Sequence, residues 1–237
     1  MTTDRDEEVR RVGATVAEAV ERAFGTVATV HAALCPELDD AVRAGRPLLD
    51  DGVREVLLEP GQLAVGLGLV LAPRPESGLP LRLEWWQVEP GSDRLRRLEP
   101  DLKPTSLGYY DYTATEWFDV PRRSGRRHVV GPYVDVHGTG RYVLTLTEPV
   151  VAGGEFVGVA GVDVSVHRFE RHLLERLGRL PVPFVVLDGE GRVVLSTAAR
   201  WLVGDLPTGA GVVGPAVPVP GVPWRLLLVD EGSALTA

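Results

Sequence analysis

Short turn sequences typical of β-hairpins join strand-like segments of this chain, and they limit the folds that it can adopt. Residues 141–151 and 155–166 have strand character and are separated by the tight-turn sequence Ala-Gly-Gly at 152–154. A second turn sequence, at 188–191, interrupts the strand-like residues 182–197. Strands joined by turns this short pair antiparallel. The pattern argues against a doubly wound parallel sheet and predicts an α+β protein built on antiparallel sheets.

The first 34 residues carry a helical pattern instead. Apolar residues, mostly valine, recur at spacings of three and four from Asp4 to about Leu34, which marks one face of a helix. At 1.5 Å per residue this helix is about 45 Å long. Two interpretations stay open: the helix packs along its own sheet, or it packs on a partner chain.

The remaining pattern orders the chain into modules. We expect two short helices in 36–58 and an irregular polar and aromatic segment at 100–128. The predicted strands are 63–72, 81–89, 130–137, 141–151 and 155–166, followed after a helix at 167–178 by a hairpin in 182–197 and strands at 212–219 and 223–230. The predicted domains are a long N-terminal helix (1–34), a first, ligand-binding module (35–166), a linking helix (167–180) and a smaller second antiparallel β module (181–237).

Charge and motifs exclude several classes of function. The formal net charge is −8 and no basic run is long enough to follow a phosphate backbone, so we expect no nucleic-acid partner. The sequence has no P-loop, dinucleotide, nucleophile-elbow or zinc-protease motif, and Cys35 is its single cysteine. We therefore predict no cofactor, no metal and no catalytic residue. No signal peptide and no membrane span is recognisable, which predicts a soluble cytoplasmic protein.

Three consecutive strands each carry polar residues on one face. Side chains two apart in a strand share a face, so Tyr133 lies with Asp135, Thr145 with Thr147, and Asp163 with the small Gly161. An ordinary solvated sheet face would alternate in the same way. Two features favour a binding pocket: five aromatic residues lie within 109–118, and the two acids have no Lys or Arg near them on their strands.

These residues resemble a known family. Residues 110–166 are similar to the Cache domains, which are extracytoplasmic PAS-like sensor modules of bacterial chemoreceptors and sensor kinases. The resemblance rests on the aromatic loop ending in Trp117-Phe118, the strand Gly131-Pro132-Tyr133-x-Asp135, the Thr145-to-Pro149 strand and the strand Gly158-Val-Ala-Gly161-Val-Asp163. The long first helix and the shorter second unit resemble the double Cache arrangement. The resemblance implies a PAS-like sheet in the first module.

The resemblance to the amino-acid-binding branch implies a ligand site. In that branch an Arg two residues before the Trp holds the ligand carboxylate, but here that position is Thr115, and Phe118 stands where the branch prefers Tyr. Acids and aromatic walls without that Arg suit a cation, through ammonium hydrogen bonds and cation–π contact. We expect an amine or amino-acid-like ligand. The predicted ligand-binding residues are Tyr110, Trp117, Phe118, Tyr133, Asp135, Thr145 and Asp163.

Two interpretations of the basic loop stay open. Arg122, Arg123, Arg126 and Arg127 would supply a substitute carboxylate clamp if their loop folds back onto the site, whereas a solvated basic turn is the simpler interpretation.

The leading hypothesis is a soluble, non-enzymatic sensor module that binds a small molecule and signals through helix packing. One alternative is an interaction module that dimerises, or binds a partner protein, through the N-terminal helix and retains only a vestigial pocket. The other is an enzyme in which Asp135 and Asp163 act with His137 or His128 as acid and base.

Overall fold

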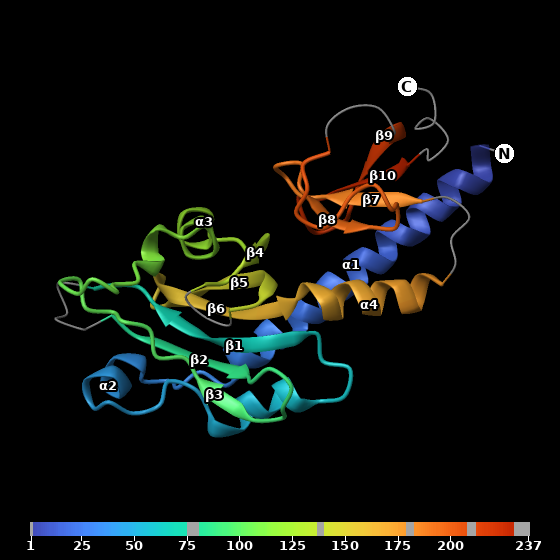
Figure 1. The fold of residues 1–237 in the computed structure, drawn as a ribbon. Helices are drawn as coiled ribbons and strands as arrows, with labels where there is room; N and C mark the ends of the chain where they lie inside the picture. The colour runs from blue at the N-terminus through green and yellow to red at the C-terminus, as the bar shows by residue number, and fades with distance from the viewer. Residues whose placement is uncertain (1, 75–80, 137–139, 179–182, 208–211, 230–237) are drawn as a thin grey trace. The chain divides into compact units, whose positions relative to one another are not determined.

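A computed structural model describes residues 2–74, 81–136, 140–178, 183–207 and 212–229 (Figure 1). It confirms the α+β prediction, with one long N-terminal helix and two separate antiparallel sheets joined by a helix. His137, one of the proposed acid–base groups, lies outside the described residues.

The larger sheet has six strands in the order β3-β2-β1-β6-β5-β4. Their bounds are β1 Ala64–Leu71, β2 Leu83–Val88, β3 Leu95–Arg97, β4 His128–Val134, β5 Tyr142–Ala152 and β6 Glu155–Ser165. The predicted hairpin is β5–β6, with Val143 opposite Ser165 and Thr147 opposite Gly161. β1 lies between β2 and β6 and pairs antiparallel with both. All eight residues of β1 are buried, as expected for a central strand covered on both faces.

Helices flank this sheet. They are α2 (Leu38–Arg43), the 3₁₀ helix η1 (Asp51–Leu58), the 3₁₀ turn η3 (Tyr112–Ala114) and α3 (Glu116–Ser124). The expectation of an irregular segment at 100–128 is wrong at its C-terminal end, where α3 packs against β5 and β6. The signals for α3 were present: acids in its first turn, basic residues in its last, and Gly125 in the left-handed conformation at its end. Pro121 inside the helix obscured them.

The smaller sheet has four strands in the order β8-β7-β10-β9. They are β7 (Phe184–Leu187), β8 (Val193–Ser196), β9 (Val212–Pro218) and β10 (Arg225–Val229). The linking helix, α4 (Val166–Leu177), follows β6 directly and is followed by Gly178, which has a φ of 64°.

The long helix α1 (Thr2–Ala32) buries its apolar face within the chain itself. Val12, Val16, Val27 and Val30 are each at most 1% exposed. This favours the interpretation in which the helix packs on its own chain. The exposed positions from the second turn on are mostly charged or small.

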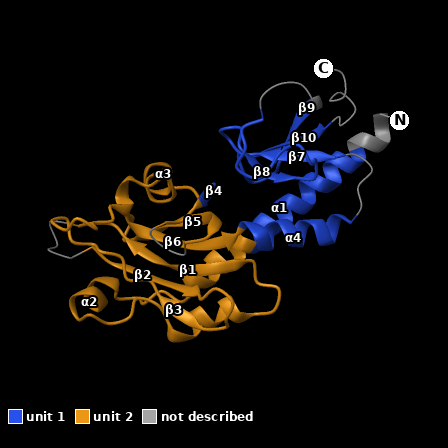
Figure 2. Cartoon of the chain, in the orientation of Figure 1, with its two compact units in different colours: residues 1–22, 131–133, 166–237 blue, residues 23–130, 134–165 orange. Residues whose placement is uncertain are grey.

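The chain divides into two compact units (Figure 2). One consists of residues 1–22, 131–133 and 166–237, and contains the smaller sheet. The other consists of residues 23–130 and 134–165, and contains most of the larger sheet. The strands that carry Thr145 and Asp163 belong to this second unit.

Candidate functional site

Asp163 is the centre of the candidate site. It lies on β6 and is 4% exposed, which is rare for a carboxylate unless it is paired or hydrogen-bonded. Thr145 Oγ1 donates a hydrogen bond to its Oδ1 at 2.7 Å, and Trp85 Nε1 donates one to its Oδ2 at 3.1 Å. Both oxygens are therefore held in a fixed orientation by neighbouring strands.

The register of the sheet places Asp163 in a line of residues that cross four strands. Gly66 on β1 is opposite both Gln87 on β2 and Asp163 on β6, and Asp163 is opposite Thr145 on β5. Directly opposed residues in an antiparallel sheet share a face. Gln87, Gly66, Asp163 and Thr145 thus form one line on one face, which we call the polar row.

The neighbouring line explains where the indole of Trp85 lies. It consists of Trp85, Gly68, Gly161 and Thr147. A Cβ on Gly66 would lie 2.8 Å from Trp85 Nε1, and one on Gly161 would lie 3.2 Å from the far end of the same ring. The indole therefore occupies the space that the glycines leave. The Trp85 ring therefore lies beside the small Gly161.

Burial changes the acidity of Asp163. Desolvation, and after it the negative charge of Asp135, raise the pKa of its carboxyl group from 3.8 to a net value of about 7. The hydrogen bonds from Thr145 and Trp85 stabilise the carboxylate and oppose this rise. Asp163 therefore changes its charge near neutral pH.

Tyr110 and Trp117 come from the aromatic segment, and both are half-buried. Burial raises the pKa of the Tyr110 phenol, and the charges of Asp135 and Asp163 add to this rise, so Tyr110 lies within electrostatic reach of both acids. A hydrogen bond with the Trp117 side chain opposes it. The carbonyl oxygen of Trp117 accepts a 2.7 Å hydrogen bond from Thr147 Oγ1, which ties α3 to β5.

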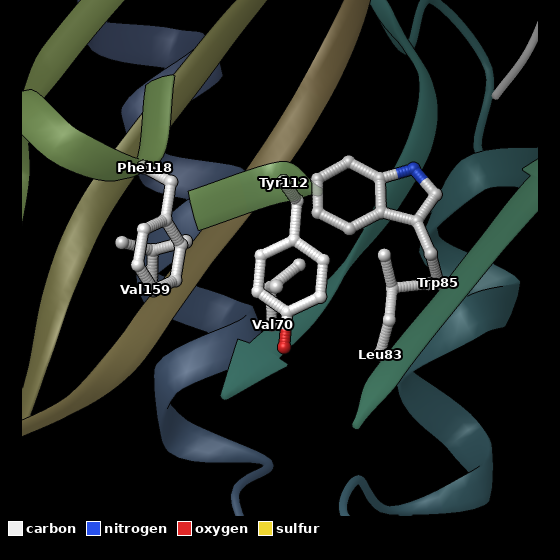
Figure 3. Close-up of a cluster of buried hydrophobic side chains, with 6 residues drawn as sticks. All are labelled: Val70, Leu83, Trp85, Tyr112, Phe118 and Val159. Atoms are coloured by element: carbon white, nitrogen blue, oxygen red, sulfur yellow. The ribbon is translucent and has the colours of Figure 1, made fainter. Parts of the chain in front are cut away.

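Phe118 and Tyr112 form the core that supports this segment (Figure 3). Both are fully buried in a cluster whose other members are Val70, Leu83, Trp85 and Val159. Their ring centroids are 5.4 Å apart, and Figure 3 shows Tyr112 between Phe118 and Trp85. The Tyr112 hydroxyl donates a 2.7 Å hydrogen bond to the carbonyl oxygen of Leu71. The Phe118 ring thus packs in the core of this unit.

Asp135 and Tyr133 lie at the end of β4. The strand ends at Val134, so the predicted strand 130–137 extends too far, and Asp135 follows the strand instead of lying within it. Its amide donates to the carbonyl oxygen of Arg141 at 3.0 Å, and its own carbonyl oxygen accepts from the amide of Gly140. Tyr133 is half-buried within β4.

Three of the four loop arginines have contacts away from the candidate site. Arg122 and Arg123 both form ion pairs with Asp119 on their own helix. The Arg127 guanidinium carbon lies 4.3 Å from the ring centroid of Phe24. These contacts favour the basic-turn interpretation over a substitute carboxylate clamp. His128 lies 2.7 Å from Glu116, with which it forms a pair.

Two residues of the site were missed in the sequence. Trp85 and Gln87 share a face of β2 with Leu83, and a glutamine within an apolar strand was a usable signal. Their position beside Asp163 was not visible, because it depends on the pairing of β1 with both β2 and β6.

Comparison with known proteins shows which family part of the chain resembles. Residues 93–171 match the family model of the first PDC sensor domain of methyl-accepting chemotaxis protein-like proteins. This match, together with the fold, confirms the resemblance to Cache sensor domains and the prediction of a sensor module.

Individual relatives agree with this class. Methyl-accepting chemotaxis protein TlpQ of Pseudomonas aeruginosa is 27% identical over 185 residues, covering 65% of this chain and 26% of that protein. The chain thus spans about a quarter of that relative's length. The ligand-binding domain of the P. aeruginosa amino-acid chemoreceptor PctC, solved with GABA, is 19% identical with a TM-score of 0.55, covering 97% of this chain and 100% of that one. An extracellular histidine kinase domain, mmHK1S-Z2, is 13% identical with a TM-score of 0.62, covering 95% and 96%.

The comparisons correct the predicted cytoplasmic location. The matched family consists of chemoreceptor sensor domains, and the solved kinase domains with this fold are extracellular. The cytoplasmic prediction is therefore wrong. Among the helices that the structure describes, none combines the length and the apolar composition needed to cross a membrane.

Proposed function

We propose that the unit containing the six-stranded sheet binds a small molecule through an ammonium group that Asp163 holds. The observation that carries this proposal is a buried carboxylate, fixed by two hydrogen bonds, with a second acid near enough to raise its pKa. Two neighbouring negative charges are unfavourable in a desolvated site. A bound ammonium group would relieve both costs at once, by neutralising Asp163 and lowering the repulsion from Asp135.

The aromatic residues fit the same ligand. Tyr110 is within electrostatic reach of both acids, and Trp117 is hydrogen-bonded to it. Aromatic faces attract cations, contributing about 0.5–2 kcal/mol each. In this proposal Tyr110, Trp117 and Tyr133 form the walls and Asp135 shares the cation. Thr145 orients Asp163, and Phe118 supports the walls from the core.

A relative offers support for the ligand class. PctC, whose ligand-binding domain has this fold, was solved with GABA, and GABA carries a primary ammonium group. In the amino-acid-binding branch an Arg holds the ligand carboxylate, and the corresponding position in this chain is Thr115. The acids are therefore the charged groups that we assign to recognition.

This proposal gives the paired acids a binding role and not a catalytic one. The matched family is a sensor family. The apolar stripe of α1, which motivated the alternative of a dimerising interaction module, is buried within the chain. No further observation favours that alternative.

The test is a thermal-shift screen of primary amines and amino acids against the full chain, followed by calorimetry on compounds that stabilise it. Stabilisation should follow RT ln(1 + [L]/Kd). Asp163→Asn keeps the shape and removes the charge, and we expect it to weaken binding by about 100-fold, since a buried charge pair loses one partner. Asp119→Asn is the matched control, because among the described residues the ion pairs of Asp119 are with Arg122 and Arg123 of its own helix. Wild-type affinity in Asp163→Asn would overturn the proposal.

A further inference from the structure

Pro121 leaves one carbonyl group of α3 without its helical donor. In an α-helix the carbonyl oxygen of residue 117 accepts a hydrogen bond from the amide of residue 121. Pro121 lies inside α3 and has no amide hydrogen, so the Trp117 carbonyl cannot receive this bond. A carbonyl group inside a protein that lacks a donor destabilises the fold. The Trp117 carbonyl therefore calls for a donor from another element.

Thr147 on β5 supplies that donor. Its hydroxyl donates a 2.7 Å hydrogen bond to the Trp117 carbonyl oxygen. Thr147 is 0% exposed, so water does not compete for this hydroxyl. The bond joins residues 30 positions apart in the sequence, and it therefore depends on how α3 lies on the sheet.

A glycine on the neighbouring strand fixes the direction of the Thr147 hydroxyl. Thr147 is opposite Gly161 on β6. A Cβ on Gly161 would lie 2.8 Å from Thr147 Cγ2, so the threonine methyl group occupies the space that the glycine leaves. Because the methyl and hydroxyl groups are on the same carbon atom, the position of one determines the direction of the other. The hydroxyl is thereby aimed at α3.

Phe118 holds α3 on the sheet in a separate way. Its ring belongs to the same buried cluster as Val159 of β6, as Figure 3 shows. This apolar contact does not depend on the Thr147 hydroxyl. The hydrogen bond to Trp117 therefore has a narrower effect, which is to set the position of the Trp117 backbone and with it the direction of the indole. That indole stacks on Tyr112, with ring centroids 6.4 Å apart.

We propose that Thr147 is a positioning residue for ligand binding, which fixes Trp117 by donating to the carbonyl group that Pro121 leaves without its helical donor. The role in ligand binding rests on the proposed function, in which Trp117 is a wall of the site. The effect on Trp117 itself can be measured without a ligand. Thr147 and Pro121 act as one unit, so a substitution of either residue changes what the other contributes.

Fluorine NMR observes Trp117 directly. The full chain labelled with 5-fluorotryptophan has five tryptophans, and the signal that is lost in Trp117→Phe belongs to Trp117. Thr147→Val keeps the shape and removes the hydroxyl, and we expect it to shift or broaden this signal. Thr147→Ser keeps the hydroxyl and should retain the wild-type signal. An unchanged Trp117 signal in Thr147→Val would overturn the proposal.

A double-mutant cycle measures the coupling of Thr147 to Pro121. We expect Thr147→Val to raise the equilibrium constant of unfolding by about tenfold, because the Trp117 carbonyl loses its donor. Pro121→Ala returns an amide to position 121, so Thr147→Val in that background should raise the constant by no more than about threefold. Urea unfolding of the four proteins measures both effects, and equal effects in the two backgrounds would overturn the proposal. If Thr147→Val alone does not fold, folding of the double variant supports the proposal and its failure to fold overturns it.

Thr29→Val is the matched control for the loss of a threonine hydroxyl. The Thr29 hydroxyl donates to the Gly25 carbonyl oxygen at 3.2 Å, within α1. In a regular helix the amide of residue 29 already donates to that oxygen, so the hydroxyl is redundant. Thr29→Val should leave the Trp117 signal unchanged and the equilibrium constant of unfolding within about twofold of wild type.

Calorimetry tests the role in ligand binding, with propylamine, pentylamine and γ-aminobutyrate as probes. We expect Thr147→Val to weaken binding by about 3- to 10-fold, as for partial loss of one cation–π contact, and Thr147→Ser to retain wild-type affinity. If wild type binds none of the three probes, the result contradicts the proposed function, while the fluorine signal still decides whether Thr147 positions Trp117. If wild type binds a probe and Thr147→Val binds it equally well, the role of Thr147 in binding is overturned and the proposed function stands.

Discussion

Asp163 combines two properties that rarely occur together in a carboxylate: it is almost inaccessible to solvent, and both of its oxygens accept hydrogen bonds from uncharged donors. Uncharged donors orient a carboxylate without neutralising it. The charge of Asp163 is thus left for a ligand to compensate, while Thr145 and Trp85 keep its geometry constant.

Ligand affinity should depend on pH through Asp163. Its pKa of about 7 means that the free protein is protonated there at lower pH, so an ammonium ligand must displace a proton. We expect affinity for a stabilising amine or amino acid to fall by about tenfold for each pH unit below about 7. Calorimetry between pH 5 and 8 measures this, and a flat profile in wild type would contradict it. Asp163→Asn should show no such dependence.

The free energy of unfolding of the unliganded protein should fall as pH rises, whereas the ligand affinity should increase. The native state holds the Asp163 proton up to about pH 7, whereas the unfolded chain releases it near 3.8. Stability from this group is therefore complete at low pH and is lost as pH rises from about 4 to 7. Relative to Asp163→Asn, the free energy of unfolding of wild type should fall by about 4 kcal/mol over that range. Urea unfolding of both proteins at several pH values tests this, and parallel profiles would argue against a raised pKa.

At the scale of elements, the site depends on how closely β1 and β2 approach. Gly68 lies opposite Trp85, and a Cβ there would be 2.2 Å from the carbonyl oxygen of Glu84 and 2.7 Å from the Trp85 Cα. Backbone atoms cannot move aside as a flexible side chain can. The glycine therefore allows the indole to lie on the sheet beside Asp163.

We expect Gly68→Ala to destabilise the protein by about 2–4 kcal/mol, because the added methyl group meets backbone. Gly25→Ala in α1 is the control, since a Cβ there meets no atom within 4 Å and alanine favours helix by up to about 1 kcal/mol. Chemical denaturation measures both. Equal effects of the two substitutions would show that the close approach of β1 and β2 is unimportant.

Elements with a strong repeating pattern could be predicted from the sequence. Elements that are too short to show a pattern, and contacts that depend on strand register, could not. The hairpin β5–β6 and the helix α1 follow directly from periodicity. Strand parity grouped Thr145 with Thr147 and Asp163 with Gly161, and the register of β5 and β6 places both pairs on one face. The three-residue strand β3 is too short to produce a pattern. Trp85 and Gln87 join Asp163 only through β1, and no local signal encodes which strands become neighbours.

At the scale of the whole molecule, α1 is part of the core and not an added arm. Its buried valines extend along most of its length, from Val9 to Val30. Its residues are divided between the two compact units, with 2–22 in one and 23–32 in the other.

Val16→Asp should therefore unfold at least the unit that contains it, because it places an unpaired charge at a position that is 0% exposed. Circular dichroism and thermal melting should show a loss of several kcal/mol. Ala14→Asp, at an exposed position of the same helix, should leave the melting temperature nearly unchanged. If Val16→Asp instead melts like wild type and alters only the sedimentation coefficient, the stripe is an interface between chains.

The central claim is that Asp163 holds the ammonium group of a small ligand. A crystal structure of the full chain with its best-stabilising amino acid tests this most directly. We predict the ligand nitrogen about 3 Å from an Asp163 carboxylate oxygen, with Tyr110 and Trp117 against the ligand. A ligand bound away from Asp163, for example in the hollow of ≈ 330 Å³ lined by Asp39, Arg74 and Glu155, would contradict the claim.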